Sequence, residues 1–402
     1  MSEHVVIIGA GQAGAQAVQT LRAEGFDGPI TMVGDEAYAP YQRPPLSKAY
    51  LLGSFERARL FLKADAYYAE SGCSLILNSH ATAIHRAERL VDLSDGRTLS
   101  YDKLLLATGA RVRQLKCPGA DLAGIHYLKT IADVDGLQAV FQAGKRIAIV
   151  GGGYIGLEVA AVGAKRGLEV TVFEAMDRLM ARAVSPELSA FYAAEHQKAG
   201  VTLKLKTGVE AIEGNVKVER VIAGGQSYEA DIVLVGIGVI PCDALAVKAG
   251  LASEDGIVVD QNARTGDPHI WAAGDCTRHV GREGHSIRLE CVQNAIDQAK
   301  HAALAMVGKA KTYSEVPWFW SDQYDLKLQI AGLARPTDRR VARGDPATRK
   351  FAVFHLRDGA VAAVEAVNAV PEYMIGKKLV AEGKKIAPEI LADMSVPMKQ
   401  MA

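Results

Sequence analysis

Two glycine-rich segments, each preceded by an apolar run, constrain the fold of this 402-residue chain more than any other feature. The first, residues 9–14, reads Gly-Ala-Gly-Gln-Ala-Gly and follows Val5–Ile8. The second, residues 151–156, reads Gly-Gly-Gly-Tyr-Ile-Gly and follows Ile147–Val150. A strand that turns through such glycines into a helix begins a dinucleotide-binding βαβ unit, where the pyrophosphate lies on backbone N–H groups that a side chain would block. One match alone is weak evidence, but two in context predict two bound nucleotides.

The residues that follow each fingerprint supply this context. An alanine-rich helical stretch leads from the first fingerprint to Ile30–Val33, with Asp35 and Glu36 behind it. A similar stretch leads from the second to residues 169–173 and then to Glu174. An acidic group at this place accepts hydrogen bonds from the ribose hydroxyls of adenosine and repels a 2′-phosphate. The second site is therefore expected to prefer NADH to NADPH.

Length and composition narrow the class of protein. With 402 residues, 49% of them hydrophobic, and 39 glycines, the chain should form two or three domains of α/β layers. Its 46 basic and 46 acidic residues cancel, so no net charge attracts it to nucleic acid or anionic lipid. The sequence shows neither an apolar run of roughly 20 residues, as a membrane helix needs, nor a signal-peptide pattern at its start. We expect a cytoplasmic protein that binds neither nucleic acid nor membrane.

The five cysteines, Cys73, Cys117, Cys242, Cys276 and Cys291, show no C-x-x-C spacing and no clustering with histidine. Cysteines placed in this way favour structural thiols over metal ligands or a redox pair. No metal site is predicted.

The duplication extends beyond the glycine turns. Residues 101–110 form an apolar strand that runs into Ala-Thr-Gly, and residues 230–238 form a comparable strand that ends among glycines. Residues 269–276 form a third such strand, which delivers Asp275 at its carboxyl end, where ligands lie in open α/β sheets. Residues 292–306 have helical apolar spacing, and from about Lys311 the sequence becomes aromatic and mixed, which indicates a separate C-terminal α+β domain. The predicted domains are residues 1–112 with 239–311, residues 113–238, and residues 312–402.

Four segments carry a resemblance to a known family. They are Pro-Tyr-Gln-Arg-Pro-Pro-Leu-Ser-Lys at residues 40–48, the second fingerprint extended through residue 161, Ala-Gly-Asp-Cys at residues 273–276, and Pro-Trp-Phe-Trp-Ser-Asp-Gln-Tyr at residues 317–324. Together they resemble the two-dinucleotide flavoprotein disulfide reductase superfamily. More narrowly, the chain is similar to the putidaredoxin reductase and Rieske dioxygenase ferredoxin reductase family.

The resemblance implies a glutathione-reductase-like fold of two Rossmann-like domains and a C-terminal α+β domain. It implies an FAD-dependent NADH:ferredoxin oxidoreductase, which passes hydride from NADH to FAD and then single electrons to an acidic [2Fe-2S] ferredoxin feeding a Rieske dioxygenase or a P450. Disulfide reductases carry a cysteine pair beside the flavin, whereas residues 43–48 of this chain contain no cysteine. Electrons are therefore expected to leave the flavin directly for an external acceptor. As a separate expectation, the protein acts as a monomer or weak dimer.

The resemblance also assigns site residues. Those expected to bind FAD are Gly9, Gly11, Gly14, Asp35, Glu36, Arg43, Lys48, Ala107, Thr108, Gly109, Lys129, Gly274, Asp275, Val292 and Trp320. Those expected to bind NADH are Gly151, Gly153, Tyr154, Ile155, Gly156, Glu158, Glu174, Gly236 and Glu290. Lys48, Glu158 and Trp320 are expected nearest the chemistry. Lys129 stands where several relatives have arginine, which weakens the case for a bidentate phosphate contact there.

Three of these residues have structural alternatives. Lys48, expected beside the flavin N5 edge and paired with Glu158, is on composition alone more simply a solvated surface lysine. Asp275 is expected on the ribityl chain near the pyrophosphate, and the alternative is a helix N-cap. Glu290 is expected near the nicotinamide carboxamide, and the alternative is a helix-start glutamate favoured by the dipole.

Two further expectations concern the C-terminal domain. Of Trp318 and Trp320, we expect one to point inward and the other to reach a surface, and the resemblance selects Trp320 as the residue at the flavin edge. A basic group, Arg335, Arg339, Arg340 and Arg343, is expected to help dock an acidic ferredoxin, with a solvated loop as the alternative.

Two rival functions remain open. In one, the same architecture serves as an NADH oxidase or passes electrons to a different carrier. In the other, the protein is a redox-controlled flavin-binding protein resembling apoptosis-inducing factor, which shares the motif of residues 40–48. The zero net charge and the lack of a targeting segment argue against the second rival.

Overall fold

The computed structural model describes residues 3–401. Contacts divide the chain into two compact units. The first comprises Met1–Gln42, Arg57–Arg111 and Val239–Pro317, and the second comprises Arg43–Glu56, Val112–Gly238 and Trp318–Ala402. Two short strands, β8 (Ala110–Val112) and β17 (Val239–Pro241), lie where the chain passes from one unit to the other.

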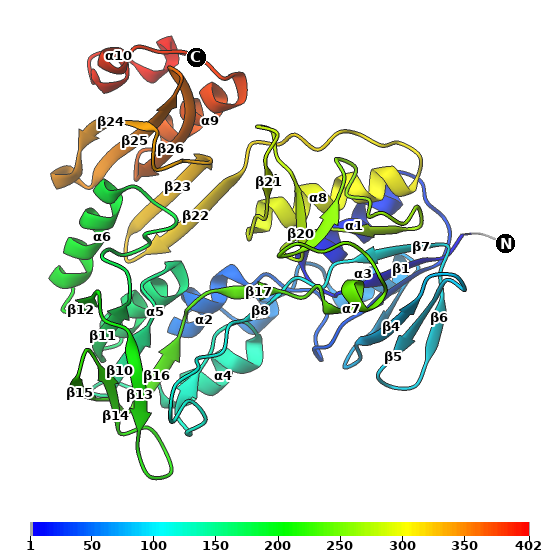
Figure 1. Ribbon diagram of the computed structural model, residues 1–402, viewed down its shortest axis with the longest axis horizontal. Helices are drawn as coiled ribbons and strands as arrows, with labels where there is room; N and C mark the ends of the chain where they lie inside the picture. The colour runs from blue at the N-terminus through cyan, green and yellow to red at the C-terminus, as the bar shows by residue number, and fades with distance from the viewer. Residues whose placement is uncertain (1–2, 402) are drawn as a thin grey trace. The chain divides into compact units, whose positions relative to one another are not determined.

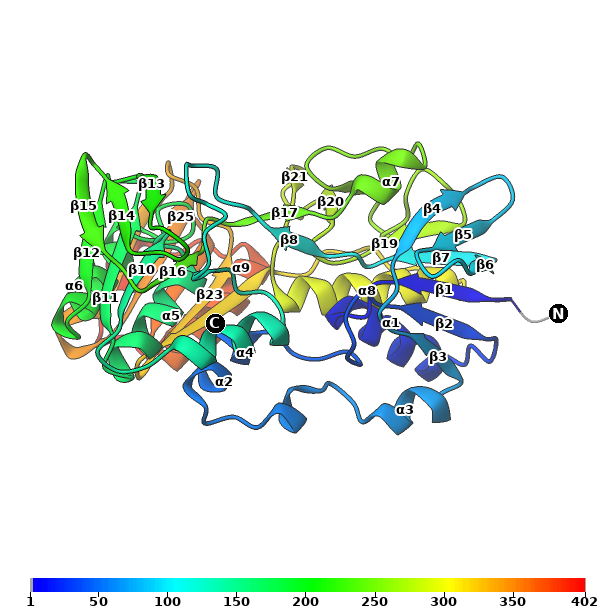
Figure 2. The same ribbon diagram turned by 90° about the horizontal axis from the view of Figure 1, so that it is seen from below.

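The first unit is built on a parallel sheet in the order β19-β7-β1-β2-β3. Its strands are Ile270–Ala272, Lys103–Leu106, Val5–Ile8, Ile30–Val33 and Cys73–Ile76. Helices α1 (Gln12–Ala23) and α8 (Val292–Met306) lie side by side against one face of it, as Figure 2 shows. The strands are buried on both faces, because alternate side chains of β1 enter two different apolar cores.

Smaller elements complete this unit. They are the antiparallel sheet of β4 (Ala81–His85), β5 (Leu90–Leu93) and β6 (Thr98–Ser100), the sheet of β18 (Ile257–Val259), β20 (Thr277–Val280) and β21 (Ser286–Ile287), and helices α3 (Asp65–Glu70) and α7 (Ala244–Lys248).

The second unit begins with a sheet of the same design, in the order β12-β11-β10-β16-β9. Its strands are Thr202–Leu205, Glu169–Glu174, Arg146–Val150, Ile232–Val235 and Ile125–His126. The helices of this part are α2 (Ala49–Leu52), α4 (Ile131–Val140), α5 (Tyr154–Lys165) and α6 (Pro186–Lys198), and a hairpin sheet adds β13 (Val209–Glu213), β14 (Arg220–Ala223) and β15 (Gln226–Glu229). In both units the strand before the glycine fingerprint pairs in parallel with its two neighbours in the sheet. Strand β1 pairs with β7 and β2, and strand β10 pairs with β11 and β16. The predicted duplication of whole modules is confirmed.

The second unit also contains an antiparallel sheet in the order β22-β23-β26-β25-β24, visible in yellow to orange in Figure 1. Its strands are Trp318–Gln323, Leu326–Gly332, Ala360–Val367, Lys350–Arg357 and Arg339–Asp345, followed by α9 (Val370–Glu382) and α10 (Pro388–Ala392). The predicted fold class, two Rossmann-like modules with a C-terminal α+β part, is confirmed.

The contacts group the chain differently from the predicted domain boundaries in two respects. Residues 43–56, expected in the first nucleotide domain, belong to the second unit. The C-terminal sheet shares one apolar core with the second module, in which Leu157 of α5 and Tyr192 of α6 pack with Leu328 and Phe351. A large shared core of this kind explains why the two parts form one compact unit.

Candidate nucleotide-binding sites

The three glycines of the first fingerprint differ in what a side chain would meet. A Cβ on Gly9, which has φ +122°, would lie 2.0 Å from the carbonyl oxygen of Ala107. A Cβ on Gly14 would lie 2.2 Å from the Gly9 carbonyl oxygen, whereas one on Gly11 would meet no protein atom within 4 Å. Two of the glycines are thus required by packing. The middle one leaves open the side from which a pyrophosphate would approach.

The second fingerprint repeats this geometry. A Cβ on Gly151, with φ +109°, would lie 2.4 Å from the carbonyl oxygen of Gly236, and one on Gly156 would lie 2.2 Å from the Gly151 carbonyl oxygen. A Cβ on Gly153 would again meet nothing within 4 Å. Gly236 therefore matches Ala107 of the first module. Both fingerprints have the shape that a dinucleotide requires.

Glu174 ends β11 beside the second fingerprint. Its Oε2 accepts the N–H of Gly152 at 2.7 Å, and its Oε1 accepts the N–H of Met176 at 2.8 Å. This carboxylate therefore orders the glycine turn as well as placing a negative charge next to it. In the first module Asp35 is exposed, and Glu36 is half-buried and accepts the Tyr41 hydroxyl at 2.5 Å.

Asp275 lies in a tight turn between β19 and β20. A strand, not a helix, follows it, so the alternative of a helix N-cap is wrong. The turn is held by Gln298 of α8, whose Oε1 accepts the N–H of Gly274 at 2.8 Å and the hydroxyl of Thr277 at 2.8 Å. Sequence reasoning missed Gln298, because nothing in its local pattern relates it to a turn 24 residues away.

Helix α8 begins at Val292, with Cys291 as its N-cap residue. The first N–H groups of a helix have no partner within it, which leaves the backbone of Val292 suited to a ligand oxygen. Glu290 lies before the cap, is exposed and pairs with Arg288. Glu290 thus lies just outside the first turn of α8, which contains no acidic residue, and neither the predicted role nor the helix-start alternative is tested by its contacts.

Lys48 and Glu158 form an ion pair in the second unit. Lys48 Nζ lies 2.8 Å from Glu158 Oε2, and the two side chains are 19% and 4% exposed. The same Oε2 accepts the Ser47 hydroxyl at 2.5 Å, and Oε1 accepts the Ser321 hydroxyl at 2.6 Å. Lys48 is thus not the solvated surface lysine of the alternative interpretation. Sequence reasoning missed both serines, which carry no spacing signal.

The other predicted residues have local roles as well. Arg43 donates to the carbonyl oxygen of Lys129 at 2.5 Å, and the Thr108 hydroxyl, beside Gly109, donates to the carbonyl oxygen of Cys242 at 2.7 Å. The ring of Tyr154 lies 4.4 Å from that of Phe319, centroid to centroid, and Ile155 is 41% exposed. Nothing in these contacts tests a nucleotide-binding role, so these assignments stay predictions.

The expectation that Trp318 and Trp320 diverge is wrong. Their rings lie 5.5 Å apart at 32°, and both are half-buried. Residues two apart in a strand point to the same side of the sheet, and both tryptophans lie on β22. Phe319, between them, packs on Tyr154 instead.

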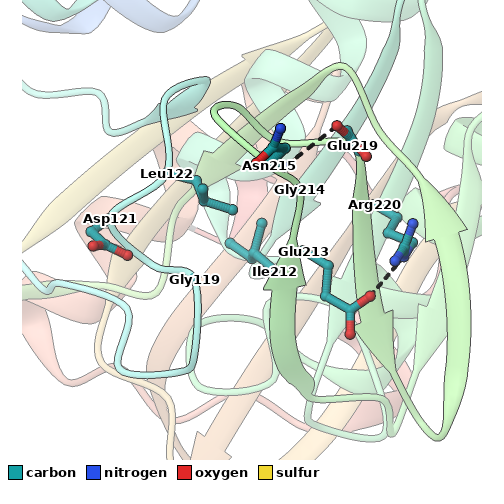
Figure 3. Close-up of a pocket in the computed structure, with 9 residues that line it drawn as sticks. All are labelled: Gly119, Asp121, Leu122, Ile212, Glu213, Gly214, Asn215, Glu219 and Arg220. Atoms are coloured by element: carbon teal, nitrogen blue, oxygen red, sulfur yellow. Dashed lines mark hydrogen bonds and ion pairs between the residues drawn. The ribbon is translucent and has the colours of Figure 1, made fainter.

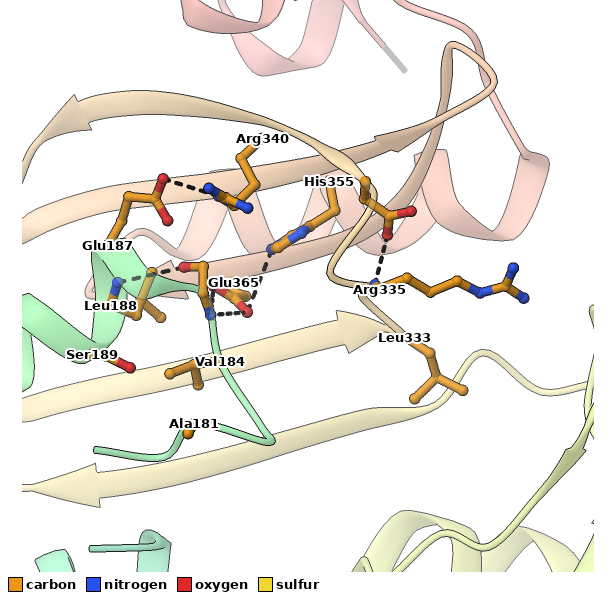
Figure 4. Close-up of polar contacts among 12 residues, drawn as sticks. Ala181, Val184, Glu187, Leu188, Ser189, Leu333, Arg335, Arg340, His355 and Glu365 are labelled. Atoms are coloured by element: carbon orange, nitrogen blue, oxygen red, sulfur yellow. Dashed lines mark hydrogen bonds and ion pairs between the residues drawn. The ribbon is translucent and has the colours of Figure 1, made fainter. Parts of the chain in front are cut away.

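The four arginines do not form one basic surface, and three of them lie on strand β24 rather than on a loop. Arg343 is buried, and its guanidinium donates to the carbonyl oxygens of Leu391, Asp393 and Val396 at 3.1, 2.6 and 2.8 Å. Arg340 donates to Glu187 at 3.0 Å, as Figure 4 shows. The expectation that Arg343 docks a partner is therefore wrong, because it holds the segment after α9.

None of the five cysteines, all of which lie in the described part of the chain, forms a disulfide bond. Burial raises the pKa of the thiols of Cys73, Cys276 and Cys291 to about 11 each, and it also raises the pKa of Cys117. Thiols of this kind are protonated near neutral pH and are poor nucleophiles.

A surface pocket of about 580 Å³ lies on the hairpin of β13 and β14 and on the loop around Leu122 (Figure 3). Of the described residues that line it, none is among those predicted to bind a nucleotide. This pocket is separate from the glycine turns in sequence and belongs to the second unit alone.

The two fingerprints and their strands define a protein that holds two dinucleotides. Comparison with known proteins agrees: residues 3–302 match the family model of pyridine nucleotide-disulphide oxidoreductases, and residues 318–402 match a reductase C-terminal model. Similar proteins include the 5,5′-dehydrodivanillate O-demethylase ferredoxin reductase subunit of Sphingobium sp., 43% identical over 98% of this chain and 97% of that protein. Putidaredoxin reductase of Pseudomonas putida is 39% identical over 100% of this chain and 97% of its own length.

Among solved structures, the covalent putidaredoxin reductase–putidaredoxin complex matches with a TM-score of 0.97 and 39% identity, covering 99% of this chain and 98% of that one. The chain therefore belongs to the pyridine nucleotide-disulphide oxidoreductase family, among the ferredoxin reductases related to putidaredoxin reductase. The predicted family and the predicted cofactors, FAD and a nicotinamide dinucleotide, are confirmed. Within the described residues, no helix combines the length and apolar character needed to cross a membrane.

Proposed function

We propose that this protein is an NADH-dependent ferredoxin reductase that supplies single electrons to a [2Fe-2S] ferredoxin of a Rieske dioxygenase or P450 system. The observation that carries the proposal is the combination of two dinucleotide-binding glycine turns with a segment, residues 43–48, that contains no cysteine and ends in Lys48, which pairs with Glu158. FAD, when bound, would accept a hydride from NADH and pass the electrons on one at a time. Relatives named ferredoxin reductases cover almost the whole chain and support the acceptor class.

The residues of the chain would bind and orient the nucleotides rather than exchange protons with them. The glycine turns would receive the two pyrophosphates, and Glu174 would select NADH through its charge. Lys48 would supply a fixed positive charge, held by Glu158, where negative charge develops. Its placement beside the flavin N5 edge rests on the resemblance.

The test is anaerobic stopped-flow reduction of the holoenzyme by NADH, followed by mixing with [2Fe-2S] ferredoxins. We expect rapid flavin bleaching by NADH and fast reoxidation by an acidic ferredoxin. Cytochrome c reduction should be slow without ferredoxin and rise steeply when it is added. Equally fast turnover with O₂ alone would identify an NADH oxidase. Tight retention of NAD with negligible turnover would point to a flavin-dependent binding protein.

We also propose a cytoplasmic location, which the absence of a disulfide among the five described cysteines supports, since disulfides are rare in that reducing compartment. Fractionation of the native host, followed by immunodetection, tests this. Recovery in the periplasmic fraction would contradict it.

A further inference from the structure

A row of buried polar side chains reaches Glu158 from the C-terminal sheet. Ser321 and Gln323 lie on β22, and His196 lies on α6; their exposed fractions are 0%, 1% and 0%. Gln323 Nε2 lies 3.3 Å from Ser321 Oγ, and His196 Nε2 lies 2.9 Å from Gln323 Oε1. The Tyr324 hydroxyl lies 2.8 Å from His196 Nδ1 and completes the row.

The direction of every hydrogen bond in this row follows from the donors available. A carboxylate only accepts, so the one proton of the Ser321 hydroxyl goes to Glu158. Gln323 must then turn its NH₂ group toward Ser321 and its carbonyl oxygen toward His196. That oxygen only accepts, which places the imidazole proton on Nε2 and leaves Nδ1 to accept the Tyr324 hydroxyl. All four donors therefore point toward Glu158.

This directed row can orient Glu158 but cannot carry a proton along its length. Gln323 interrupts any relay, because a neutral amide does not readily pass a proton from its oxygen to its nitrogen. Burial lowers the pKa of His196, so the imidazole is neutral near pH 7, as the row requires. Glu158 then receives one donor on Oε1 and two, from Lys48 and Ser47, on Oε2.

We propose that Ser321 is a positioning residue for the Lys48–Glu158 pair, and that Gln323, His196 and Tyr324 hold its hydroxyl on Glu158. This inference deepens the proposed function and rests on it for the role of Lys48 in hydride transfer. A strand of the C-terminal sheet thereby sets the placement of a charge in the nucleotide-binding module. Without Ser321, Oε1 of a buried carboxylate has lost its donor and the pair is free to shift.

The direction of the row can be tested without any cofactor. Proton-detected ¹⁵N spectra of protein labelled at histidine distinguish the two neutral tautomers, and the His196→Phe variant identifies the signal. We expect the Nε2–H tautomer of His196 between pH 6 and 8. The Nδ1–H tautomer, or a protonated ring at pH 7, would overturn the row.

The positioning role is tested by a double-mutant cycle in the holoenzyme. Ser321→Ala should slow single-turnover flavin reduction by NADH about tenfold, since small misplacements of a catalytic group are costly, while the dissociation constant of NADH changes less than about twofold. It should also make the reduction potential of bound FAD more negative, because a hydroxyl dipole that offsets the Glu158 charge is lost. In a Glu158→Gln background Ser321→Ala should have little further effect on this rate.

Two variants guard against a general loss of structure. Gln323→Met, which leaves Ser321 in place, should slow flavin reduction in the same direction but less. Ser189→Ala removes a similarly buried hydroxyl of the same unit, which donates to the carbonyl oxygen of Leu179 at 2.5 Å, and should leave the rate within about twofold. Equal slowing by Ser321→Ala with and without Glu158 would overturn the proposal. These rates end at flavin reduction, so a failure to reduce ferredoxin would count against the proposed function alone.

Discussion

At the scale of single residues, the three glycines of each fingerprint carry different constraints. Gly156 is fixed by the carbonyl oxygen of Gly151, while Gly153 faces no protein atom. We expect Gly156→Ala to lower the free energy of unfolding by about 1 to 3 kcal/mol through overpacking. Gly153→Ala should leave stability nearly unchanged but weaken NADH binding at least about tenfold, because the methyl group enters the pyrophosphate site. Thermal unfolding and NADH titration measure the two effects. A stable Gly153→Ala protein with unchanged NADH affinity would contradict the assignment.

The ion pair gives a second prediction at this scale. Lys48→Ala leaves the nearly buried carboxylate of Glu158 without its cation, at a cost of about 3 to 5 kcal/mol in stability. We expect it to slow flavin reduction by NADH more than it weakens FAD binding. Adding Glu158→Gln should restore part of the stability but not the rate. Unchanged single-turnover reduction in the Lys48→Ala variant would remove Lys48 from the chemistry.

At the scale of elements, Glu174 at the end of β11 is expected both to select the nicotinamide cofactor and to order the second glycine turn. Glu174 accepts two backbone N–H groups and presents its charge beside the second glycine turn. Glu174→Gln removes the charge at constant size and should reduce the preference for NADH over NADPH about tenfold. Glu174→Ala should also lower kcat/KM for both nucleotides, because Gly152 and Met176 lose their acceptor. Comparison of kcat/KM for the two nucleotides measures both effects; an unchanged ratio in Glu174→Gln would exclude this role.

At the scale of the whole molecule, buried histidines make stability depend on pH. Burial lowers the pKa of His279 to about 4, from about 6.5 in the unfolded chain, and lowers that of His196 in the same direction. Between these pH values the unfolded state binds a proton that the folded state does not. The contribution of the buried neutral histidine to the free energy of unfolding is therefore fully present above pH 6.5 and is lost as the pH drops toward 4. For His279 the loss amounts to about 3 kcal/mol.

Urea unfolding at several pH values measures this dependence. His279→Phe, which can keep an aromatic contact with Tyr313, should flatten the curve between pH 4 and 6.5. His285→Phe, at an exposed histidine, is the control and should leave the curve unchanged. A curve for His279→Phe as steep as that of the parent protein would assign the effect to other groups.

Much of this fold could be predicted from the sequence because its signals are local. The glycine turns, β1, β2 and α8 lie where apolar spacing and glycine geometry placed them. Ser47, Ser321 and Gln298 could not be predicted, since each acts on a residue brought near only by folding, 111 and 163 positions from Glu158 in the case of the serines. Arg343 was misjudged for a related reason: its guanidinium pairs with Glu372, 29 positions away, and donates to backbone carbonyl groups, and neither kind of partner can be recognised in the local sequence.

The apolar core that Leu157 and Tyr192 share with Leu328 and Phe351 bears on how relatives could be recombined. A chimaera that exchanges residues 318–402 alone would build the shared core from two parents that evolved independently. It would also take Ser321 from one parent and Glu158 from the other. Exchanging residues 43–56, 112–238 and 318–402 together keeps both faces of that core from one parent. Engineered hybrids of these reductases should therefore be cut at all five boundaries between the units, which follow residues 42, 56, 111, 238 and 317.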